Sequence, residues 1–137
     1  IITDGLISKP FNPTFATTIP EKFNVKFLWD TGATNTVITQ ELANKIGLLS
    51  TGKIITHGVG GEHLANSFLV NVELSNGVIF PFIPVTSGIL TGFDVLIGMD
   101  IIKYGDFSIT NFDNKTQFSF RVPSIDESVD SAIEVIA

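Results

Sequence analysis

An alternating pattern, in which every second residue from Phe68 to Leu74 is large and apolar, constrains the fold of this chain more than any other feature. A period of two is typical of a strand with one buried face. The residues Ser75–Gly77 then carry a hairpin-turn signal, and the apolar run Val78–Val85 is predicted to return as the next strand. Because this run contains two prolines, we expect it at a sheet edge or with a short break.

Strand signals outnumber helix signals in the rest of the chain. Two more strand pairs are predicted: Thr14–Ile19 with Val25–Trp29, and Phe107–Phe112 with Thr116–Val122 around the turn Asp113–Asn114. Two short helices are predicted: Gln40–Ile46, capped by Thr39 and stopped by Gly47, and Met99–Tyr104, stopped by Gly105. Together these elements predict a mainly β fold, a small barrel with one or two short helices.

Length and composition favour one folded domain. Of the 137 residues, 44% are hydrophobic and 16% are charged, which is a globular composition. The net charge of −6 argues against nucleic acid or an anionic membrane as the main partner, since both bind basic surfaces. There is no cysteine, so disulfides and thiolate metal sites are excluded and the compartment is left open. No apolar run approaches the roughly 18 residues of a membrane span, and no signal peptide is visible at Ile1.

Three apolar residues, Phe27–Trp29, directly precede the carboxylate of Asp30. An isolated ionised carboxylate is costly to bury, so its neighbours must hold it. Gly32 permits a tight turn that would project the carboxylate from the strand end into a cleft. Backbone N–H groups and the Thr31 hydroxyl are the expected hydrogen-bond partners.

Three sequence elements, in this order, resemble the retroviral-type, or retropepsin-like, aspartic proteases. They are the signature Asp30-Thr31-Gly32-Ala33 followed by Thr34, the glycine-rich Val59-Gly60-Gly61, and the segment Asp94–Ile102. In that family the second element is the tip of a flap hairpin and the third leads into the C-terminal helix. The resemblance covers about Thr14 to Val122, so we expect an N-terminal arm at 1–13, a protease domain at 14–122 and an acidic C-terminal tail at 123–137. The implied fold is a small closed acid-protease-type β-barrel of one lobe.

The resemblance implies an aspartic endopeptidase that acts on a peptide or protein as a homodimer, without metal or cofactor. The chemistry needs two carboxylates that share one proton, and this chain has one Asp-Thr-Gly and no Asp-Ser-Gly. Asp30 would therefore meet its symmetry mate across a two-fold axis. Active-site support is implied for Thr31, Gly32 and Ala33. Substrate binding is implied for Thr34, Asn35, Gly58, Val59, Gly60, Gly61, Ile89 and Phe93, with Ile55 and Leu90 as further pocket candidates.

Some residues depart from this pattern. Thr34 and Met99 are uncharged where many retroviral enzymes carry an acid and an arginine that pair. His57, Glu62 and His63 suggest a metal site, but solvated hairpin side chains are the favoured interpretation. Two alternatives stay open: a non-catalytic peptide-binding or dimerisation module of the same fold, and a latent protease domain of a longer polyprotein. The first predicts a monomer, or a dimer whose signature aspartates stand too far apart to share a proton.

Overall fold

The computed structural model describes residues 1–58 and 60–124, which form nine strands and two short helices. The strands are β1 (Ile2–Ser8), β2 (Lys22–Trp29), β3 (Val37–Thr39), β4 (Gly52–Gly58), β5 (Gly61–Leu74), β6 (Ile79–Gly88), β7 (Val95–Ile97), β8 (Asp106–Phe112) and β9 (Lys115–Arg121). The helices are α1 (Gln40–Ile46) and α2 (Met99–Ile102). The predicted mainly β fold with short helices is therefore confirmed.

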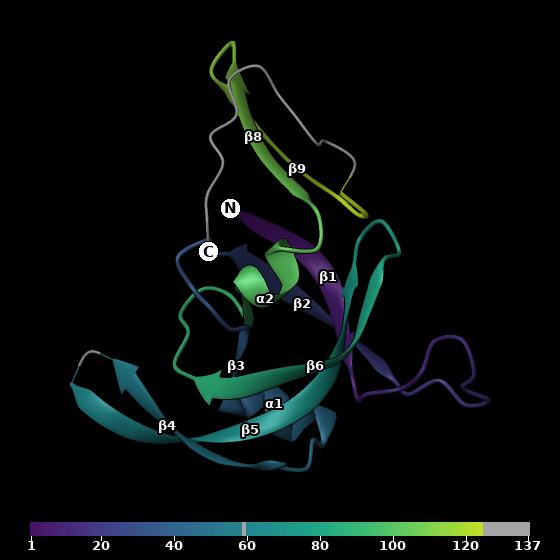
Figure 1. Cartoon of the computed structure of the whole chain (residues 1–137), viewed down its shortest axis with the longest axis vertical. Coiled ribbons are helices and arrows are strands. Elements are labelled where there is room, and N and C mark those ends of the chain that lie inside the picture. Colours follow the sequence, from purple (N-terminus) through teal and green to yellow (C-terminus); the bar gives the residue numbers. More distant parts are fainter. Residues whose placement is uncertain (59, 125–137) are drawn as a thin grey trace.

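Six of these strands close into a barrel. They are hydrogen-bonded in the order β1-β2-β7-β3-β6-β5, and β1 closes the circle because it also pairs with β5. Gly5 lies at this seam, opposite Val25 on β2 and Leu74 on β5. A Cβ at Gly5 would lie 2.0 Å from Phe27 Cε2 and 2.8 Å from Glu73 O, so the strands pack this closely only around a glycine. β4 lies outside the circle, along the first part of β5 (Figure 1).

The barrel interior is filled by the apolar side chains that the alternating pattern predicts. On β5, the four apolar residues of the alternation are all buried: Phe68, Val70, Val72 and Leu74. The other large apolar side chains that are essentially inaccessible come from six different elements: Ile7, Phe27, Ile38, Val85, Val95, Ile97 and Ile101. Burying one such side chain contributes about 1.5–3 kcal/mol. The core therefore fixes the strand ends from which the candidate site is built.

The helix α1 begins and ends where the sequence predicts. Thr39 Oγ1 accepts a hydrogen bond from Leu42 N at 3.1 Å, which caps the first turn. Gly47 adopts a left-handed φ of 80° and its N–H bonds to Ala43 O, so the helix stops there. The helix α2 is shorter than predicted and ends at Ile102.

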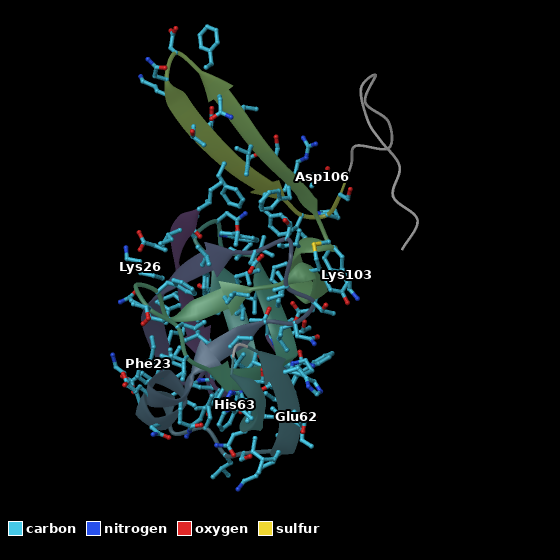
Figure 2. The ribbon with its side chains drawn as sticks, turned by 90° about the vertical axis from the view of Figure 1, so that its left-hand side faces the viewer. Phe23, Lys26, Glu62, His63, Lys103 and Asp106 are labelled. Atoms are coloured by element: carbon cyan, nitrogen blue, oxygen red, sulfur yellow. The ribbon has the colours of Figure 1, made fainter. Side chains whose placement is uncertain are left out.

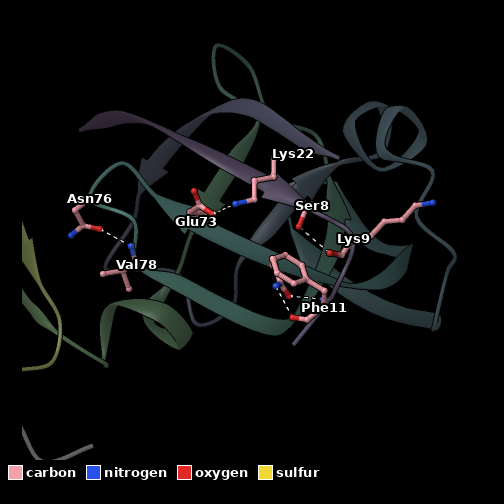
Figure 3. Close-up of polar contacts among 8 residues, drawn as sticks. Ser8, Lys9, Phe11, Lys22, Glu73, Asn76 and Val78 are labelled. Carbon is pink, nitrogen blue, oxygen red and sulfur yellow. Dashed lines mark hydrogen bonds and ion pairs between the residues drawn. The ribbon is translucent and has the colours of Figure 1, made fainter. Parts of the chain in front are cut away.

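The strand β6 carries the break that its prolines predict. The β5–β6 register shifts between Val70 and Val72, and Phe82 has a positive φ of 53°. Asn71, which is 2% exposed, bonds the main chain at this point: its Oδ1 accepts from Phe82 N at 3.0 Å, and its Nδ2 donates to Phe11 O at 2.8 Å. The contact at Phe11 is drawn in Figure 3. A buried amide thus satisfies the main-chain N–H of Phe82, which the interrupted ladder leaves, and also bonds the loop at Phe11.

The strand predicted for Thr14–Ile19 is wrong. The Asn12 side chain accepts hydrogen bonds from Thr14 N at 2.9 Å and Phe15 N at 3.3 Å, so the segment begins as a turn. Local bonding of this kind competes with a strand ladder. The place beside β2 that was predicted for this segment is taken by β1. Residues 1–13, expected as an arm, therefore contain a barrel strand. The domain boundary at residue 14 stays a prediction.

The strands β8 and β9 form a separate hairpin that projects from the barrel (Figure 1). Asp113 and Asn114 have φ values of 51° and 59°, which fit the predicted two-residue turn. The hairpin packs on Trp29, whose ring centroid lies 4.9 Å from that of Phe118 and 5.0 Å from that of Phe120. These aromatic contacts attach the hairpin to the end of β2.

Candidate active site

Asp30 stands at the end of β2, where a tight turn begins. Its N–H still donates to Ile97 O on β7 at 2.9 Å, so the sheet positions its backbone. Gly32 N donates to Asp30 Oδ1 at 2.9 Å, and Ala33 N donates to Asp30 O at 3.2 Å. A Cβ at Gly32 would lie 3.2 Å from Asp30 Oδ1, which is tighter than an ordinary contact. The half-buried carboxylate is therefore held by a fixed turn, with a main-chain N–H as hydrogen-bond donor.

The loop 30–36 is tied to the segment that follows β7. Met99 N donates to Ala33 O at 2.8 Å, and Asp100 N donates to Thr34 O at 3.2 Å. The structure thus brings together the Asp-Thr-Gly signature and the Asp94–Ile102 segment. The predicted site residues Thr31, Thr34 and Asn35 lie exposed on this loop.

Two residues of this region were not identified from the sequence. Thr36 is fully buried, and its N–H and Oγ1 donate to the Asp100 carboxylate at 3.0 Å and 2.8 Å. The signal that could have found Asp100 is the one that identified Asp30: a carboxylate set within an apolar run. Thr36 carried no comparable signal, since one threonine among several in the loop is not distinctive.

The strands β4 and β5 form the long hairpin that the flap prediction requires. Their pairing ends at Gly58 opposite Gly61. Gly60 and Gly61 have φ values of 95° and 103°, a conformation that favours glycine. Val59 lies outside the described residues, so its predicted role is not addressed by the structure.

A pocket of about 580 Å³ lies beside this hairpin. It is lined by Gln40, Thr56, His63, Leu64, Ala65, Ser87, Gly88 and Ile89. Of the predicted pocket residues it contains Ile89, whose side chain is 99% exposed, but not Ile55, Leu90 or Phe93. Leu90 and Phe93 are half-buried in the segment between β6 and β7. Asp30 does not line this pocket, so the carboxylate and the pocket do not form one enclosed cavity.

Polar side chains on the hairpin are largely solvated. His57 Nδ1 lies 3.7 Å from Glu62 Oε1, a pair that is ionic only when the histidine is protonated, and both side chains are mostly exposed. Glu62 and His63 lie far from Asp106 at the base of the projecting hairpin (Figure 2). Within residues 1–58 and 60–124 there is no group of three side chains suited to hold a metal ion. In the same part of the chain, no helix has the length and apolarity needed to cross a bilayer.

A sequence profile of the family described as "gag-polyprotein putative aspartyl protease" matches residues 16–104. The chain belongs to this family. The matched range includes the Asp30 turn, the β4–β5 hairpin and the segment from β7 into α2. The predicted resemblance to retropepsin-like aspartic proteases is therefore confirmed.

Solved structures of retropepsin-like proteases resemble this family member at low sequence identity. A retropepsin-like aspartic protease from Rickettsia conorii is 21% identical, with a TM-score of 0.47; the match covers 80% of this chain and 86% of that one. The EIAV protease complexed with the inhibitor HBY-793 is 24% identical, with a TM-score of 0.45; the match covers 58% of this chain and 75% of that one. A comparison with curated proteins gave no match.

Proposed function

We propose that this protein is an aspartic endopeptidase, which hydrolyses peptide bonds with a water activated by the Asp30 carboxylates of two identical subunits. The observation that carries the proposal is the Asp30 turn, in which a half-buried carboxylate at a strand end accepts a hydrogen bond from Gly32 N at 2.9 Å. Membership of the aspartyl protease family supports the same chemistry.

The proposed reaction follows from one proton shared by two carboxylates. Two carboxylates held close together lose their protons in two separate steps, so between these steps one of them is ionised and the other keeps its proton. The ionised Asp30 takes a proton from water, whose oxygen attacks the scissile carbonyl carbon. The protonated Asp30 of the other subunit donates a hydrogen bond to the carbonyl oxygen. When the C–N bond breaks, the hydroxyl group that came from the water remains on the new carboxylic acid. The proton that Asp30 took from the water is passed to the leaving amine.

A second subunit is needed because the loop 30–36 contains a single carboxylate. A two-fold axis beside Asp30 would place two copies of that carboxylate around one water. The side chains of Thr31, Thr34 and Asn35 are exposed on the same loop, which leaves them available to the second subunit or to substrate. We assign Thr31, Gly32 and Ala33 to the support of the catalytic turn.

An extended peptide is the proposed substrate class. The β4–β5 hairpin exposes apolar side chains along its length, with Ile55 59% and Leu64 73% accessible. An extended peptide can add strand-like main-chain hydrogen bonds to such a hairpin and place alternate side chains against apolar ones. The proposed substrate-binding residues are Thr34, Asn35, Gly58, Val59, Gly60, Gly61, Ile89 and Phe93.

Subunit mixing with the variant Asp30→Asn tests both halves of this proposal. The amount of wild-type protein is held constant, an equal amount of the variant is added, and cleavage of a peptide library is measured after subunit exchange. Activity should fall to about half, because half of the wild-type copies then pair with an inactive partner.

Other outcomes lead to different conclusions. Unchanged activity on mixing would show that one subunit works alone. Cleavage that the Asp30→Asn homodimer retains in full would remove Asp30 from the mechanism. A stable, folded wild type that cleaves nothing in the library, and that sediments as a monomer, would favour a non-catalytic binding module.

A further inference from the structure

The far end of the catalytic loop is fastened by a hydrogen-bonded pair, Thr36 and Asp100. Thr36 N donates to Asp100 Oδ2 at 3.0 Å, and Thr36 Oγ1 donates to Asp100 Oδ1 at 2.8 Å. The same hydroxyl accepts from Gly98 N at 3.2 Å. Because an amide can only donate, the hydroxyl proton must go to Asp100, so the direction of every bond in this small network is fixed.

The geometry points to a positioning role: we infer that Asp100, acting through Thr36, holds the loop 30–36 in the conformation that presents Asp30 for catalysis. This inference rests on the proposed peptidase function. Asp100 itself is not expected to touch substrate or the reacting water.

The loop and the Asp100 segment are closely packed against each other. A Cβ at Gly98 would lie 2.7 Å from Asn35 O and 3.0 Å from Ala33 O, so the two backbones abut at this glycine. Two main-chain bonds, from Met99 N and Asp100 N to the loop carbonyls, lie beside the contact. The side-chain bonds at Asp100 complete the attachment at the buried end of the loop, next to β3.

The Asp100 carboxylate has its hydrogen-bond partners within this region. Besides the two bonds to Thr36, its Oδ1 accepts from Ile101 N at 3.0 Å. Hydrogen bonds to a carboxylate are about twice as strong as those between neutral groups. Thr34 and Met99 are uncharged, so the acid–arginine pair of many retroviral enzymes is absent at those positions. In this chain the carboxylate of Asp100, one residue further along, joins the same two segments.

A set of four variants tests the inference. Asp100→Asn removes one acceptor oxygen, Thr36→Val removes the hydroxyl at nearly constant volume, and Thr36→Ser keeps the hydroxyl. The matched control is Asp94→Asn, because Asp94 Oδ2 also accepts from a main-chain amide, Lys26 N at 3.0 Å, but lies outside the loop contact.

We expect kcat to fall by about 10- to 100-fold in Asp100→Asn and Thr36→Val, since small misplacements of a catalytic group have effects of that order. KM should rise as well, because Thr34 and Asn35, the proposed substrate-binding residues of the same loop, are misplaced together with Asp30. Thr36→Ser should keep kcat close to wild type, and so should Asp94→Asn. If Asp100→Asn and Thr36→Val lower kcat no more than Asp94→Asn does, the positioning role is wrong.

Amide hydrogen exchange of the folded variants supplies a readout that does not depend on peptidase activity. The Thr36 amide should exchange about 10-fold faster or more in Asp100→Asn, and the Gly98 amide in Thr36→Val, because each loses its acceptor. In Asp94→Asn the Lys26 amide should respond instead. Unchanged exchange at Thr36 and Gly98 would overturn the inference. Wild-type protein without peptidase activity but with these exchange changes would overturn the proposed function and leave the loop contact standing.

Discussion

The indole ring of Trp29 and the ring of Phe118 pack with their centroids 4.9 Å apart and their planes at 44°. Trp29 immediately precedes Asp30, and its Nε1 donates to Thr3 Oγ1 on β1 at 2.8 Å. One side chain therefore joins β1, β2 and the projecting β8–β9 hairpin beside the proposed catalytic residue. The hairpin therefore packs on the residue that precedes Asp30, although it lies outside the barrel.

Replacing Trp29 should destabilise the whole protein. We expect Trp29→Ala to lower the free energy of unfolding by about 3–5 kcal/mol, since a buried aromatic side chain leaves a cavity between barrel and hairpin. Urea unfolding followed by circular dichroism measures this. Phe112→Ala is the control, because Phe112 is 80% exposed near the hairpin turn, and its effect should stay within about 0.5 kcal/mol. Equal effects of the two substitutions would show that the Trp29 contacts do not hold the hairpin.

Asp30→Asn should separate catalysis from folding. The amide oxygen of asparagine can still accept from Gly32 N, so the turn and the thermal midpoint should be retained. The variant side chain can neither take a proton from water nor share one with residue 30 of the other subunit. We therefore expect kcat to fall by about 10²- to 10⁴-fold. Asp113→Asn, at a turn position that asparagine tolerates well, serves as control and should keep full activity. A loss of folded structure in Asp30→Asn would mean that the carboxylate is structural.

The rate of peptide cleavage should rise and then fall with increasing pH. At low pH both carboxylates of the pair carry protons, so no base is left to activate water; at high pH both are ionised, so no donor faces the carbonyl. The check is kcat/KM across the pH range in which the wild type stays folded, as monitored by circular dichroism. A single sigmoid, with no second limb inside that range, would argue against a shared proton.

A methyl group at the hairpin tip should affect the flap through backbone conformation alone. Gly61 has a φ of 103°, and nothing lies within 4 Å of a Cβ built there, so Gly61→Ala is strained without a clash. We expect a loss of about 1–3 kcal/mol in the free energy of unfolding, or a locally altered hairpin, with lower kcat/KM. Gly52→Ala, at the other end of the hairpin, is the matched control, since its Cβ would make an ordinary contact at 3.5 Å with Ser67 Oγ. Equal behaviour of the two variants would contradict a requirement for positive φ at the tip.

Local signals predicted the elements that depend on local chemistry. The helix α1 lies where Thr39 and Gly47 place it, and the β8–β9 turn forms at Asp113 and Asn114. Hydrophobic alternation predicted the buried face of β5 because side-chain burial in a strand has a period of two. The Asp30 turn was recognisable because a carboxylate directly after an apolar run needs hydrogen-bond donors close by to stabilise it.

Long-range pairings were not visible in the same way. The strand-like composition of Thr14–Ile19 was outweighed by the Asn12 side chain, and no local pattern indicated that β1 would take its place beside β2. The hydrogen bond between Thr36 and Asp100 joins residues 64 positions apart, so no local sequence pattern around one residue predicts contact with the other. The hairpin packing on Trp29 likewise becomes apparent only when the aromatic residues of β8 and β9 are placed in space.

The double pairing of β1 has a practical consequence for handling this protein. Residues 2–8 are flanked by neighbours on both sides, so trimming them would turn the cylinder into an open sheet with two bare edges. Such edges pair with other chains, so a preparation that lacks residues 2–8 should aggregate. Any sequence that precedes residue 2 must leave this strand free to lie between β2 and β5.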